Sequence, residues 1–186
     1  MAEPVVVVLA AGRATRFGGG KLDAMLAGKR VGQWVLDALE AAGLAPGVVV
    51  TGPDAPAFAA NSGWPLVTNP DPHAGLGTSL AIAAHQTEGP LLVALADMPL
   101  VPTSHFAALL QYRFAATAWS GGKSGVPALF PAALLPKLRN LSGDQGAGPL
   151  LTATPDLALI EAPDDALLDI DRPEDLARAK TILQRG

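Results

Sequence analysis

A glycine-rich segment that directly follows an apolar run carries residue types suited to holding phosphate groups. Residues 10–21 contain four glycines together with the cations Arg16 and Lys21, and they come straight after Val5–Leu9. Glycine lets backbone N–H groups approach phosphate oxygens closely, and the two side chains add positive charge beside them. The spacing matches neither G-x-G-x-x-G nor G-x-x-x-x-G-K-S/T, so these residues alone leave a phosphate-binding loop and an ordinary connection equally open.

Two aspartates that each follow an apolar stretch, Asp97 and Asp171, are candidates for holding a hard cation. Mg²⁺ binds one or two carboxylates together with phosphate oxygens of a substrate. Each aspartate also has a structural alternative, because Asp97 could cap the turn before Pro99 and Asp171 could cap the helix that begins at Pro173. The apolar neighbours of Asp97 favour metal binding there, whereas spacing alone leaves both roles open for Asp171.

The sequence lacks the residues that most other catalytic chemistries need. The chain has no cysteine, which excludes disulfides, thiolate metal sites and a cysteine nucleophile. The three histidines, His73, His85 and His105, lack the spacing of zinc ligands, and Ser79 lacks the G-x-S-x-G pattern of a hydrolase nucleophile. Lys123 stands among glycines and could reach a substrate phosphate, but a solvated lysine is the favoured interpretation.

Composition indicates one folded domain that does not act mainly on nucleic acid or in a membrane. The 186 residues are 49% hydrophobic and 16% charged, enough to bury a full core. Thirteen Lys and Arg against 17 Asp and Glu give a net charge of −4, whereas phosphate-backbone binding needs a basic face. Apolar runs fall short of the roughly 18–20 residues that a bilayer requires, and Glu3 and Pro4 precede the first of them. We expect a cytoplasmic protein.

Apolar runs typical of buried strands alternate along the chain with segments of helical periodicity. Val5–Leu9 is apolar at every position, as expected for a central parallel strand covered on both faces. Further strands are predicted at 48–51, 66–67, 91–96, 126–130 and 157–160. Helices are predicted over 31–42, over 55–61, from Thr78 or Ser79 to about Gln86, from Thr103 or Ser104 to about Phe114, over 131–139, near Leu150, and over 173–184. Residues 121–125 are predicted to form a loop.

This alternation predicts an α/β fold in one domain spanning residues 1–186. The expected architecture is doubly wound and Rossmann-like, with a mostly parallel sheet and helices on both of its faces. Ligands of such sheets bind beyond the carboxyl ends of the strands. Three polar segments end predicted strands, namely residues 10–21, Asp97 with Met98, and residues 169–172. We expect these segments to converge into one site.

The order of motifs along the chain resembles the MobA-like NTP transferase family. Six motifs appear in the family's order and extend from Val5 to about Leu176: Leu9-Ala10-Ala11-Gly12 with Arg16-Phe17-Gly18 and Lys21, Asn69-Pro70 with Gly75–Leu80, Leu95–Pro99, Gly125-Val126-Pro127, Gly143–Ala147, and Asp169–Asp175. Each motif alone is weak evidence, whereas six in sequence order are strong evidence.

The resemblance implies a role for each residue at a matching position. It implies nucleotide binding by Leu9, Ala10, Ala11, Gly12, Arg16, Lys21, Gly77, Thr78 and Ser79. It implies catalytic roles for Arg16, Lys21 and Asp97, a magnesium ion at Asp97 and Asp171, and acceptor binding by Gly125, Pro127 and Asp144. These roles come from the resemblance and not from the spacing of the residues.

The resemblance also implies a reaction, in which CMP passes from CTP to the phosphate of molybdopterin and pyrophosphate is released. Leu-Ala-Ala-Gly looks like the cytidylyl branch of the family, whereas the guanylyl branch more often has Leu-Ala-Gly-Gly. We expect the methyl group of Ala11 to narrow the base pocket against a purine. The partners implied are CTP, a molybdopterin-type acceptor, and a molybdoenzyme or its chaperone. Two alternatives stay open: the same chemistry with GTP or with a sugar or polyol phosphate, and a carrier that binds without catalysis.

Three departures from the family pattern concern the acceptor more than the nucleotide. Gly148 stands where the family usually has arginine, which removes a cation expected near the acceptor. Asp23 stands where the family tends to be apolar, and we expect it either to pair with Lys21 or to repel phosphate. Residues 31–34, Val-Gly-Gln-Trp, replace the more usual Pro-Leu-Leu or Pro-Val-Leu run.

Overall fold

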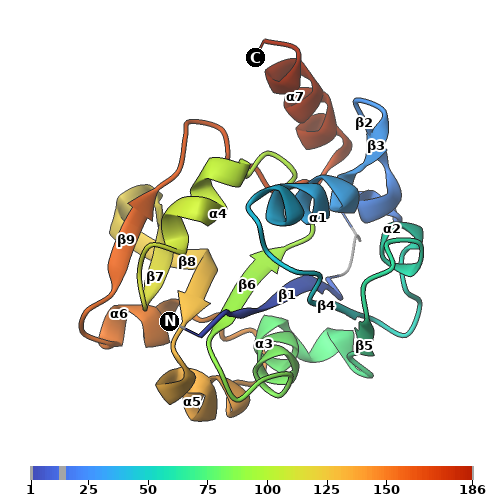
Figure 1. The fold of residues 1–186 in the computed structure, drawn as a ribbon. Coiled ribbons are helices and arrows are strands. Elements are labelled where there is room, and N and C mark those ends of the chain that lie inside the picture. Colours follow the sequence, from blue (N-terminus) through green and yellow to red (C-terminus); the bar gives the residue numbers. More distant parts are fainter. Residues whose placement is uncertain (1, 13–15, 186) are drawn as a thin grey trace.

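The computed structural model describes residues 2–12 and 16–185, and within them seven strands form one sheet (Figure 1). These strands are β1 (Val5–Ala10), β4 (Val48–Thr51), β5 (Leu66–Thr68), β6 (Leu91–Leu95), β7 (Ala115–Trp119), β8 (Lys123–Phe130) and β9 (Ala158–Glu161). Their order across the sheet is β5-β4-β1-β6-β8-β7-β9. The central strands β1 and β6 thus lie between the two halves of the domain.

The sheet is mostly parallel, as predicted, with β8 as the strand of opposite direction. β1 pairs in parallel with β4 and β6, β4 with β5, and β7 with β9. β8 runs antiparallel to both of its neighbours, β6 and β7. The turn of Ser120–Gly122 that joins β7 to β8 is too short for a crossover, so these two strands must form a hairpin.

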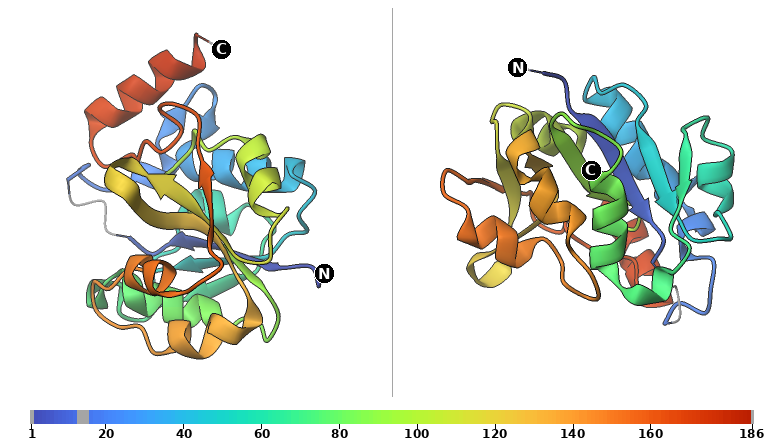
Figure 2. Two further views of the ribbon diagram at one scale, coloured as in Figure 1. Left: turned by 90° about the vertical axis from the view of Figure 1, so that its left-hand side faces the viewer. Right: turned by 90° about the horizontal axis from the view of Figure 1, so that it is seen from below.

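Helices cover both faces of the sheet, as Figure 2 shows. They are α1 (Val31–Ala41), α2 (Ala57–Ala60), α3 (Leu76–Ala84), α4 (Thr103–Leu109), α5 (Leu135–Arg139), α6 (Gly148–Ala153) and α7 (Pro173–Leu183). Short 3₁₀ turns are η1 (Lys21–Asp23), η2 (Pro72–Ala74), η3 (Ser120–Gly122) and η4 (Ala132–Leu134). One face carries α1, α2 and α4, and the other carries α3, α5 and α6.

Side chains at alternate strand positions belong to two apolar clusters, one on each face of the sheet. In β1, Val6 and Val8 pack toward α1, α2 and α4, whereas Val7 and Leu9 pack toward α3, α5 and α6. Side chains of a strand point alternately to its two faces, so a strand covered on both sides must be apolar throughout. This explains why β1 has no polar position.

Several predicted element boundaries are wrong. The helix expected to start at Thr78 or Ser79 begins at Leu76, because Gly75 at φ 93° turns the chain into it. The helix expected to reach Phe114 ends at Leu109 and is followed by β7, which the sequence analysis did not predict. The predicted loop at 121–125 lies partly in β8, which begins at Lys123. Pairing with two neighbouring strands decides the structure of this alanine-rich region.

A small hairpin outside the main sheet was also not predicted. It consists of β2 (Met25–Leu26) and β3 (Lys29–Arg30), which pair antiparallel. Ala27 and Gly28 have φ values of 47° and 89°, so both central residues of the turn are left-handed. This is the backbone that a two-residue hairpin turn requires.

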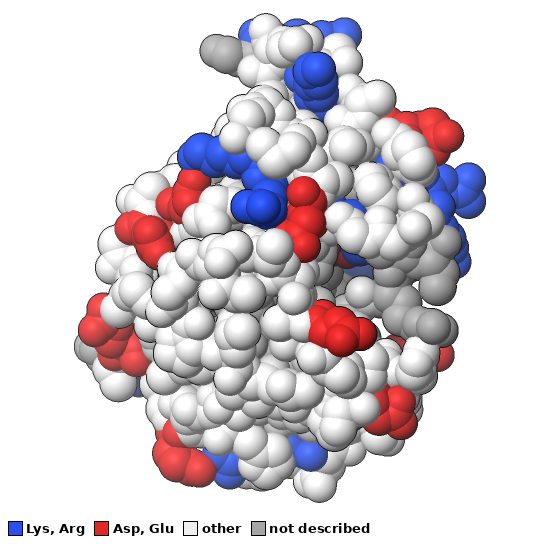
Figure 3. Space-filling model, turned by 90° about the vertical axis from the view of Figure 1, so that its right-hand side faces the viewer, with Lys and Arg blue, Asp and Glu red and all other residues white. Residues whose placement is uncertain are grey.

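The surface mirrors the low charge content of the chain. Figure 3 shows acidic and basic side chains interspersed on one face, most of which is uncharged. Within the described residues, no helix has both the length and the apolar character needed to cross a membrane.

Candidate active site

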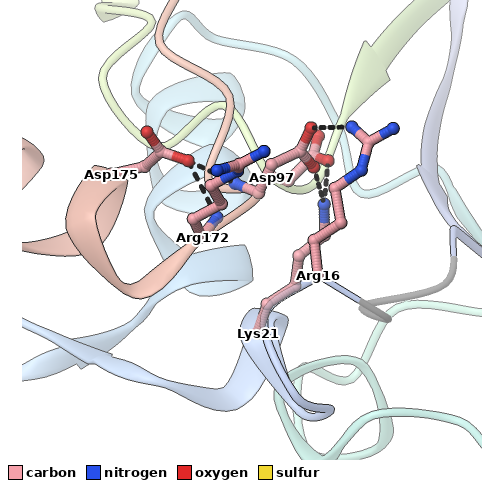
Figure 4. Close-up of polar contacts among 6 residues, drawn as sticks. Arg16, Lys21, Asp97, Arg172 and Asp175 are labelled. Atoms are coloured by element: carbon pink, nitrogen blue, oxygen red, sulfur yellow. Dashed lines mark hydrogen bonds and ion pairs between the residues drawn. The ribbon is translucent and has the colours of Figure 1, made fainter.

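Lys21 lies at the end of the glycine-rich segment and joins the two candidate metal ligands. Its Nζ donates hydrogen bonds to Asp97 Oδ2 at 2.6 Å and to Asp171 Oδ1 at 2.9 Å (Figure 4). The lysine side chain is 6% exposed, against 22% for Asp97 and 48% for Asp171. The structure thereby brings together three segments that the sequence analysis placed at one edge of the sheet. Residues 13–15 of the first segment lie outside the described residues.

Backbone hydrogen bonds hold these segments in place. Ala96 N–H donates to Leu9 O at 3.0 Å, which fixes the chain after β6 against the end of β1. Ile170 N–H donates to Asp97 O at 2.9 Å, which ties the segment before α7 to the same point. The carboxylates on the two segments are therefore positioned by the main chain and not only by the lysine between them.

The aspartate at 171 does not cap α7, so this alternative from the sequence is wrong. The Asp171 carboxylate accepts from Lys21, whereas Asp175 in the first turn of α7 reaches back and accepts with its Oδ2 from the backbone N–H groups of Asp171 and Arg172 at 3.0 and 2.8 Å. Among the described residues, the Asp97 carboxylate accepts from Lys21 alone, so it does not cap the turn before Pro99 either. Both carboxylates are available to the site.

The positive charge of Lys21 and the negative charges of Asp97 and Asp171 stabilise one another through direct contact. Burial alone would lower the pKa of Lys21, but Asp97 and Asp171 outweigh burial and leave that pKa raised. The hydrogen bond from Lys21 in turn lowers the pKa of Asp171. Arg16 Nη1 lies 3.8 Å from Asp171 Oδ2 with its side chain 72% exposed, so it is a loosely held second cation (Figure 4). The Lys21 ammonium and both carboxylates form a charged cluster.

A third carboxylate, Asp169, belongs to this neighbourhood and was not singled out from the sequence. Its Oδ1 is buried and has no hydrogen-bond partner within residues 2–12 and 16–185. Burial, together with the negative charges of Asp97 and Asp171, raises the pKa of Asp169 to about 7. The available signal was the D-x-D spacing, because residues two apart on an extended segment share one face.

The oxygen donors of Asp97 and Asp171 suit a hard divalent cation. Carboxylates are the ligands that Mg²⁺ and Mn²⁺ prefer, and both of these lie within hydrogen-bonding distance of one Nζ atom. No group of three or more His, Cys, Asp or Glu side chains in the described parts of the chain is arranged to hold a metal. The remaining ligands would therefore come from substrate oxygens and water, as is usual for Mg²⁺.

A first cavity of about 430 Å³ opens beside the charged cluster. It contains six of the residues for which nucleotide binding was predicted, together with Asp97 and Asp144. The lining residues are Leu9, Ala10, Ala11, Gly12, Lys21, Leu22, Pro72, His73, Gly75, Leu76, Ser79, Leu95, Asp97 and Asp144. The cavity therefore runs from the end of β1 to the start of α3.

Two of the predicted nucleotide contacts, Gly77 and Thr78, do not line this cavity. The Gly77 N–H donates to Gly143 O at 2.9 Å, and a Cβ at this position would lie 2.7 Å from Ser142 O. Thr78 Oγ1 donates to Ala74 O at 3.3 Å. In the structure both residues hold the start of α3 against its surroundings.

A second cavity of about 370 Å³ adjoins the first and shares three leucines with it. Its lining residues are Leu9, Leu76, Leu80, Leu95, Trp119, Ser120, Lys123, Ser124, Gly125, Val126, Gly146, Ala147 and Gly148. Lys123 is the one charged residue in this set, and Gly148 lines the same cavity. Of the three predicted acceptor contacts, Gly125 lines this cavity and Asp144 lines the first. Pro127 lines neither cavity, and its carbonyl oxygen accepts from the Thr117 hydroxyl at 2.7 Å.

Asp23 does not pair with Lys21, so this expectation is wrong, whereas repulsion of phosphate by Asp23 stays a prediction. Its Oδ2 accepts from the backbone N–H of Ala57 and its Oδ1 from that of Phe58, each at 2.7 Å. These are otherwise unpaired donors at the start of α2. Asp23 therefore fastens η1, which carries Lys21, to a helix on the neighbouring part of the fold.

The chain matches a known family model and several solved structures. The model described as the MobA-like NTP transferase domain matches residues 6–158. A nucleotidyl transferase from Methanothermobacter thermautotroptrophicus is 25% identical with a TM-score of 0.83, over 100% of this chain and 99% of that one. The manganese complex of Rv0371C from Mycobacterium tuberculosis H37Rv is 24% identical with a TM-score of 0.76, over 97% and 99% of the two chains.

A further structural relative carries a molybdopterin-related name. Molybdopterin-guanine dinucleotide biosynthesis protein A from Archaeoglobus fulgidus is 19% identical with a TM-score of 0.70, over 97% of this chain and 99% of that one. At this identity the likeness concerns the fold. No curated protein matches the chain in sequence.

Proposed function

This chain belongs to the family of MobA-like NTP transferase domains and is a nucleotidyltransferase, and we propose that it transfers CMP from CTP to the phosphate of a molybdopterin-type acceptor. The observation that carries this proposal is the charged cluster of Lys21, Asp97 and Asp171 beside two adjoining cavities. One cavity would take the nucleotide and the other the acceptor. Phosphate groups of both would then meet near the cluster.

The end of β1 supports a pyrimidine nucleotide in the first cavity. Ala10, Ala11 and Gly12 line this cavity without any side chain larger than a methyl group, and Ala11 is 8% exposed. In this proposal the methyl group of Ala11 would narrow the space available to a purine. A single methyl group accounts for only about 1–3 kcal/mol of discrimination, so we expect a preference for CTP over GTP and not an absolute selection.

Charge repulsion between two anionic reactants is the main barrier that the site has to lower. Lys21 and Arg16 would neutralise charge on the triphosphate, and the N–H groups of the glycine-rich loop would add hydrogen bonds. Asp97 and Asp171 would hold a magnesium or manganese ion, which when bound supplies further positive charge at the phosphates.

The transfer itself needs no side chain to remove a proton. An acceptor phosphate oxygen, already ionised near neutral pH, bonds to the α-phosphorus of CTP. The bond from that phosphorus to the bridging oxygen of the β-phosphate breaks, and its electron pair leaves with pyrophosphate. His105 is not placed to act as a base, since it is buried against Thr117 and burial lowers its pKa. His73 lines the first cavity, but the proposed transfer gives it no proton to remove.

The second cavity supports an acceptor that combines a flat, weakly polar body with a phosphate. Four leucine side chains and the Trp119 indole contribute apolar surface to its wall, and Lys123 adds one positive charge. The indole lies so close to Gly125 that a Cβ there would be 2.8 Å from Trp119 Nε1. A side chain at position 125 would therefore push this wall, which favours glycine at the acceptor site.

The experiment that tests the proposal is pyrophosphate release with purified protein and Mg²⁺ or Mn²⁺. CTP, GTP, ATP and UTP are each supplied with and without molybdopterin. Release from CTP that depends on molybdopterin is the expected result. Release from GTP instead would show that the nucleotide in the proposal is wrong. Release with a sugar phosphate in place of molybdopterin would show that the acceptor in the proposal is wrong. Nucleotide binding without release from any combination would indicate a carrier and overturn the proposal.

A further inference from the structure

We infer that Asn69 is a positioning residue, which holds the Ser79 hydroxyl as a hydrogen-bond donor toward the base of the nucleotide in the first cavity. This inference rests on the proposed function in one respect, namely that the ligand of this cavity is a nucleotide. It assigns a role to Asn69 and a direction to one hydroxyl proton. Neither follows from the presence of Ser79 in the cavity wall alone.

The orientation of the Asn69 amide is fixed by its surroundings. Asn69 lies directly after β5 and is fully buried, and its backbone N–H donates to Thr51 O at the end of β4 at 2.7 Å. The backbone N–H of Asp71 donates to Asn69 Oδ1 at 3.0 Å. Because an N–H group must meet the amide oxygen and not its nitrogen, the Asn69 NH₂ group has to face the other way, toward Ser79.

The contact to Ser79 then determines where the serine proton can go. Asn69 Nδ2 lies 3.0 Å from Ser79 Oγ. An amide NH₂ group only donates, so the Ser79 oxygen accepts, and its own proton remains to be donated elsewhere. Within the described residues, the Ser79 hydroxyl accepts this bond and donates none. Ser79 is 5% exposed and lines the first cavity.

A buried donor without a partner is costly, and the cavity is where a partner can bind. A buried polar group without a partner is destabilising, so an acceptor atom of the ligand would gain binding energy from meeting this hydroxyl. Ala10, Ala11 and Gly12, which line the same cavity, bring no polar side chain. The Ser79 hydroxyl is thus a preformed polar contact in an otherwise weakly polar part of the cavity.

The position in the sheet assigns this contact to the nucleoside and not to the phosphates. The charged cluster of Lys21, Asp97 and Asp171 lies at the ends of β1 and β6. Asn69 instead joins the ends of β4 and β5, and α3, which carries Ser79, packs against β1 and β4. Of the acceptor atoms on a pyrimidine nucleoside, the base carbonyl is the one that hydrogen-bonds most strongly to a hydroxyl donor.

Ser79→Ala removes the donor with little change in volume and provides the first test. We expect CTP affinity, measured by isothermal titration calorimetry with Mg²⁺ and no acceptor, to fall about fivefold to tenfold. Ser104→Ala is the matched control, because Ser104 is also in the first turn of a helix but is exposed and outside the cavity. Unchanged CTP affinity in Ser79→Ala would overturn the inference.

Asn69→Asp tests the direction of the proton while keeping the shape of the side chain. A carboxylate still accepts from Asp71 N–H, but it cannot donate to Ser79 and instead attracts the serine proton away from the cavity. We expect a similar loss of CTP affinity, with no further loss when Ser79→Ala is added, because both changes act on one proton. Additive losses would mean that Asn69 acts independently of Ser79.

A nucleotide analogue separates a directed hydrogen bond from a structural effect. The sulfur of 2-thio-CTP accepts hydrogen bonds more weakly than oxygen, so the natural chain should bind it less tightly than CTP. Ser79→Ala should bind the two equally. A loss that appears with 2′-deoxy-CTP and not with 2-thio-CTP would place the contact on the ribose and overturn the assignment to the base.

Failure of this inference is distinguishable from failure of the proposed function. If the natural chain binds GTP in place of CTP, the base in the proposed function is wrong, and the same variants are measured with GTP. Unchanged GTP affinity in Ser79→Ala would then overturn the role of Asn69 and Ser79 as well. A chain that binds none of the four nucleotides overturns both.

Discussion

Lys21 Nζ donates to Asp97 Oδ2 at 2.6 Å, so the lysine expected to bind a triphosphate is held by a carboxylate expected to bind a metal ion. The same ammonium also reaches Asp171 at 2.9 Å. When a divalent cation and a triphosphate bind, the cation would therefore replace Lys21 at the two carboxylates. The lysine would then be free to contact the phosphates. This links metal binding and nucleotide binding through one side chain.

Asp97→Ala should abolish most of the transferase activity. It removes a carboxylate that the proposed metal site needs and leaves Lys21 paired with Asp171 alone. Loss of one such electrostatic contributor typically costs a factor of about 10²–10³ in kcat. Pyrophosphate release at saturating CTP measures the effect, with Asp164→Ala, in an exposed loop, as the control. Normal activity in Asp97→Ala would show that the metal is held elsewhere.

Lys21→Met should make the fold depend on divalent cations. Removing the ammonium takes away the lysine partner of Asp97 and leaves Asp171 with the exposed Arg16, which we expect to reduce the free energy of unfolding by about 2–3 kcal/mol. Millimolar Mg²⁺ should restore much of this loss, since the buried ammonium that bridges both carboxylates is gone. Thermal unfolding with and without Mg²⁺ measures the effect.

Lys29→Met is the matched control for that measurement. Lys29 pairs with Asp37 on the exposed surface, away from the charged cluster, so its loss should not create a response to Mg²⁺. If Mg²⁺ raised the Tm of Lys21→Met no more than that of the unsubstituted chain, Asp97 and Asp171 would not be the cation site.

Asp169→Asn should stabilise the fold at alkaline pH and leave it almost unchanged at acid pH. The carboxyl group has an ordinary pKa of 3.8, which the fold raises to about 7. Between these values the unfolded chain has lost the proton and the folded chain keeps it, so folding stability falls as the pH rises from about 4 to 7. Asparagine carries no charge at any of these pH values.

The size of this effect follows from the same comparison. At pH 8 we expect Asp169→Asn to gain about 1–2 kcal/mol in the free energy of unfolding, after allowing for solvent screening of a partly exposed group. Denaturant unfolding at pH 5 and pH 8, in the presence of a chelator, measures it against Asp164→Asn. A gain of equal size at both pH values would show that charge at position 169 is not the cause.

Apolar patterning was enough to predict the centre of the fold. Val5–Leu9 and Val48–Thr51 are β-branched and apolar on both faces, and both form strands close to the predicted bounds. Residues 115–119 were not predicted as a strand, because three of the five are alanines with little intrinsic preference for a sheet. Their structure depends on antiparallel pairing with β8 and on parallel pairing with β9, which lies about 40 residues further along the chain.

The site was predictable as a location but not as a set of contacts. Placing Asp97 and Asp171 after apolar stretches pointed to one edge of the sheet, and they do meet there. The bridge through Lys21 joins residues 150 positions apart in sequence, and no local pattern encodes it. Asp23 shows the same limit, since its carboxylate is explained by the start of α2, which lies 34 residues further along the chain.

Asp23→Ala should weaken both the fold and the binding of CTP, although Asp23 touches neither cavity of the proposed reaction. Its carboxylate satisfies two backbone N–H groups at the start of α2, and loss of a capping side chain typically costs about 1–2 kcal/mol. Lys21 lies two residues away in the same 3₁₀ turn, so a loosened turn should raise the KM for CTP several-fold.

Two further substitutions make this last measurement specific. Asp23→Asn keeps one acceptor oxygen for α2, so its loss of stability and its rise in KM should both be intermediate. Asp54→Ala changes an exposed aspartate in the loop before α2 that makes no hydrogen bond to the helix in the described structure. It should leave both quantities unchanged. If Asp23→Ala lowered the Tm while the KM for CTP stayed constant, the turn that carries Lys21 would be held in place without its link to α2.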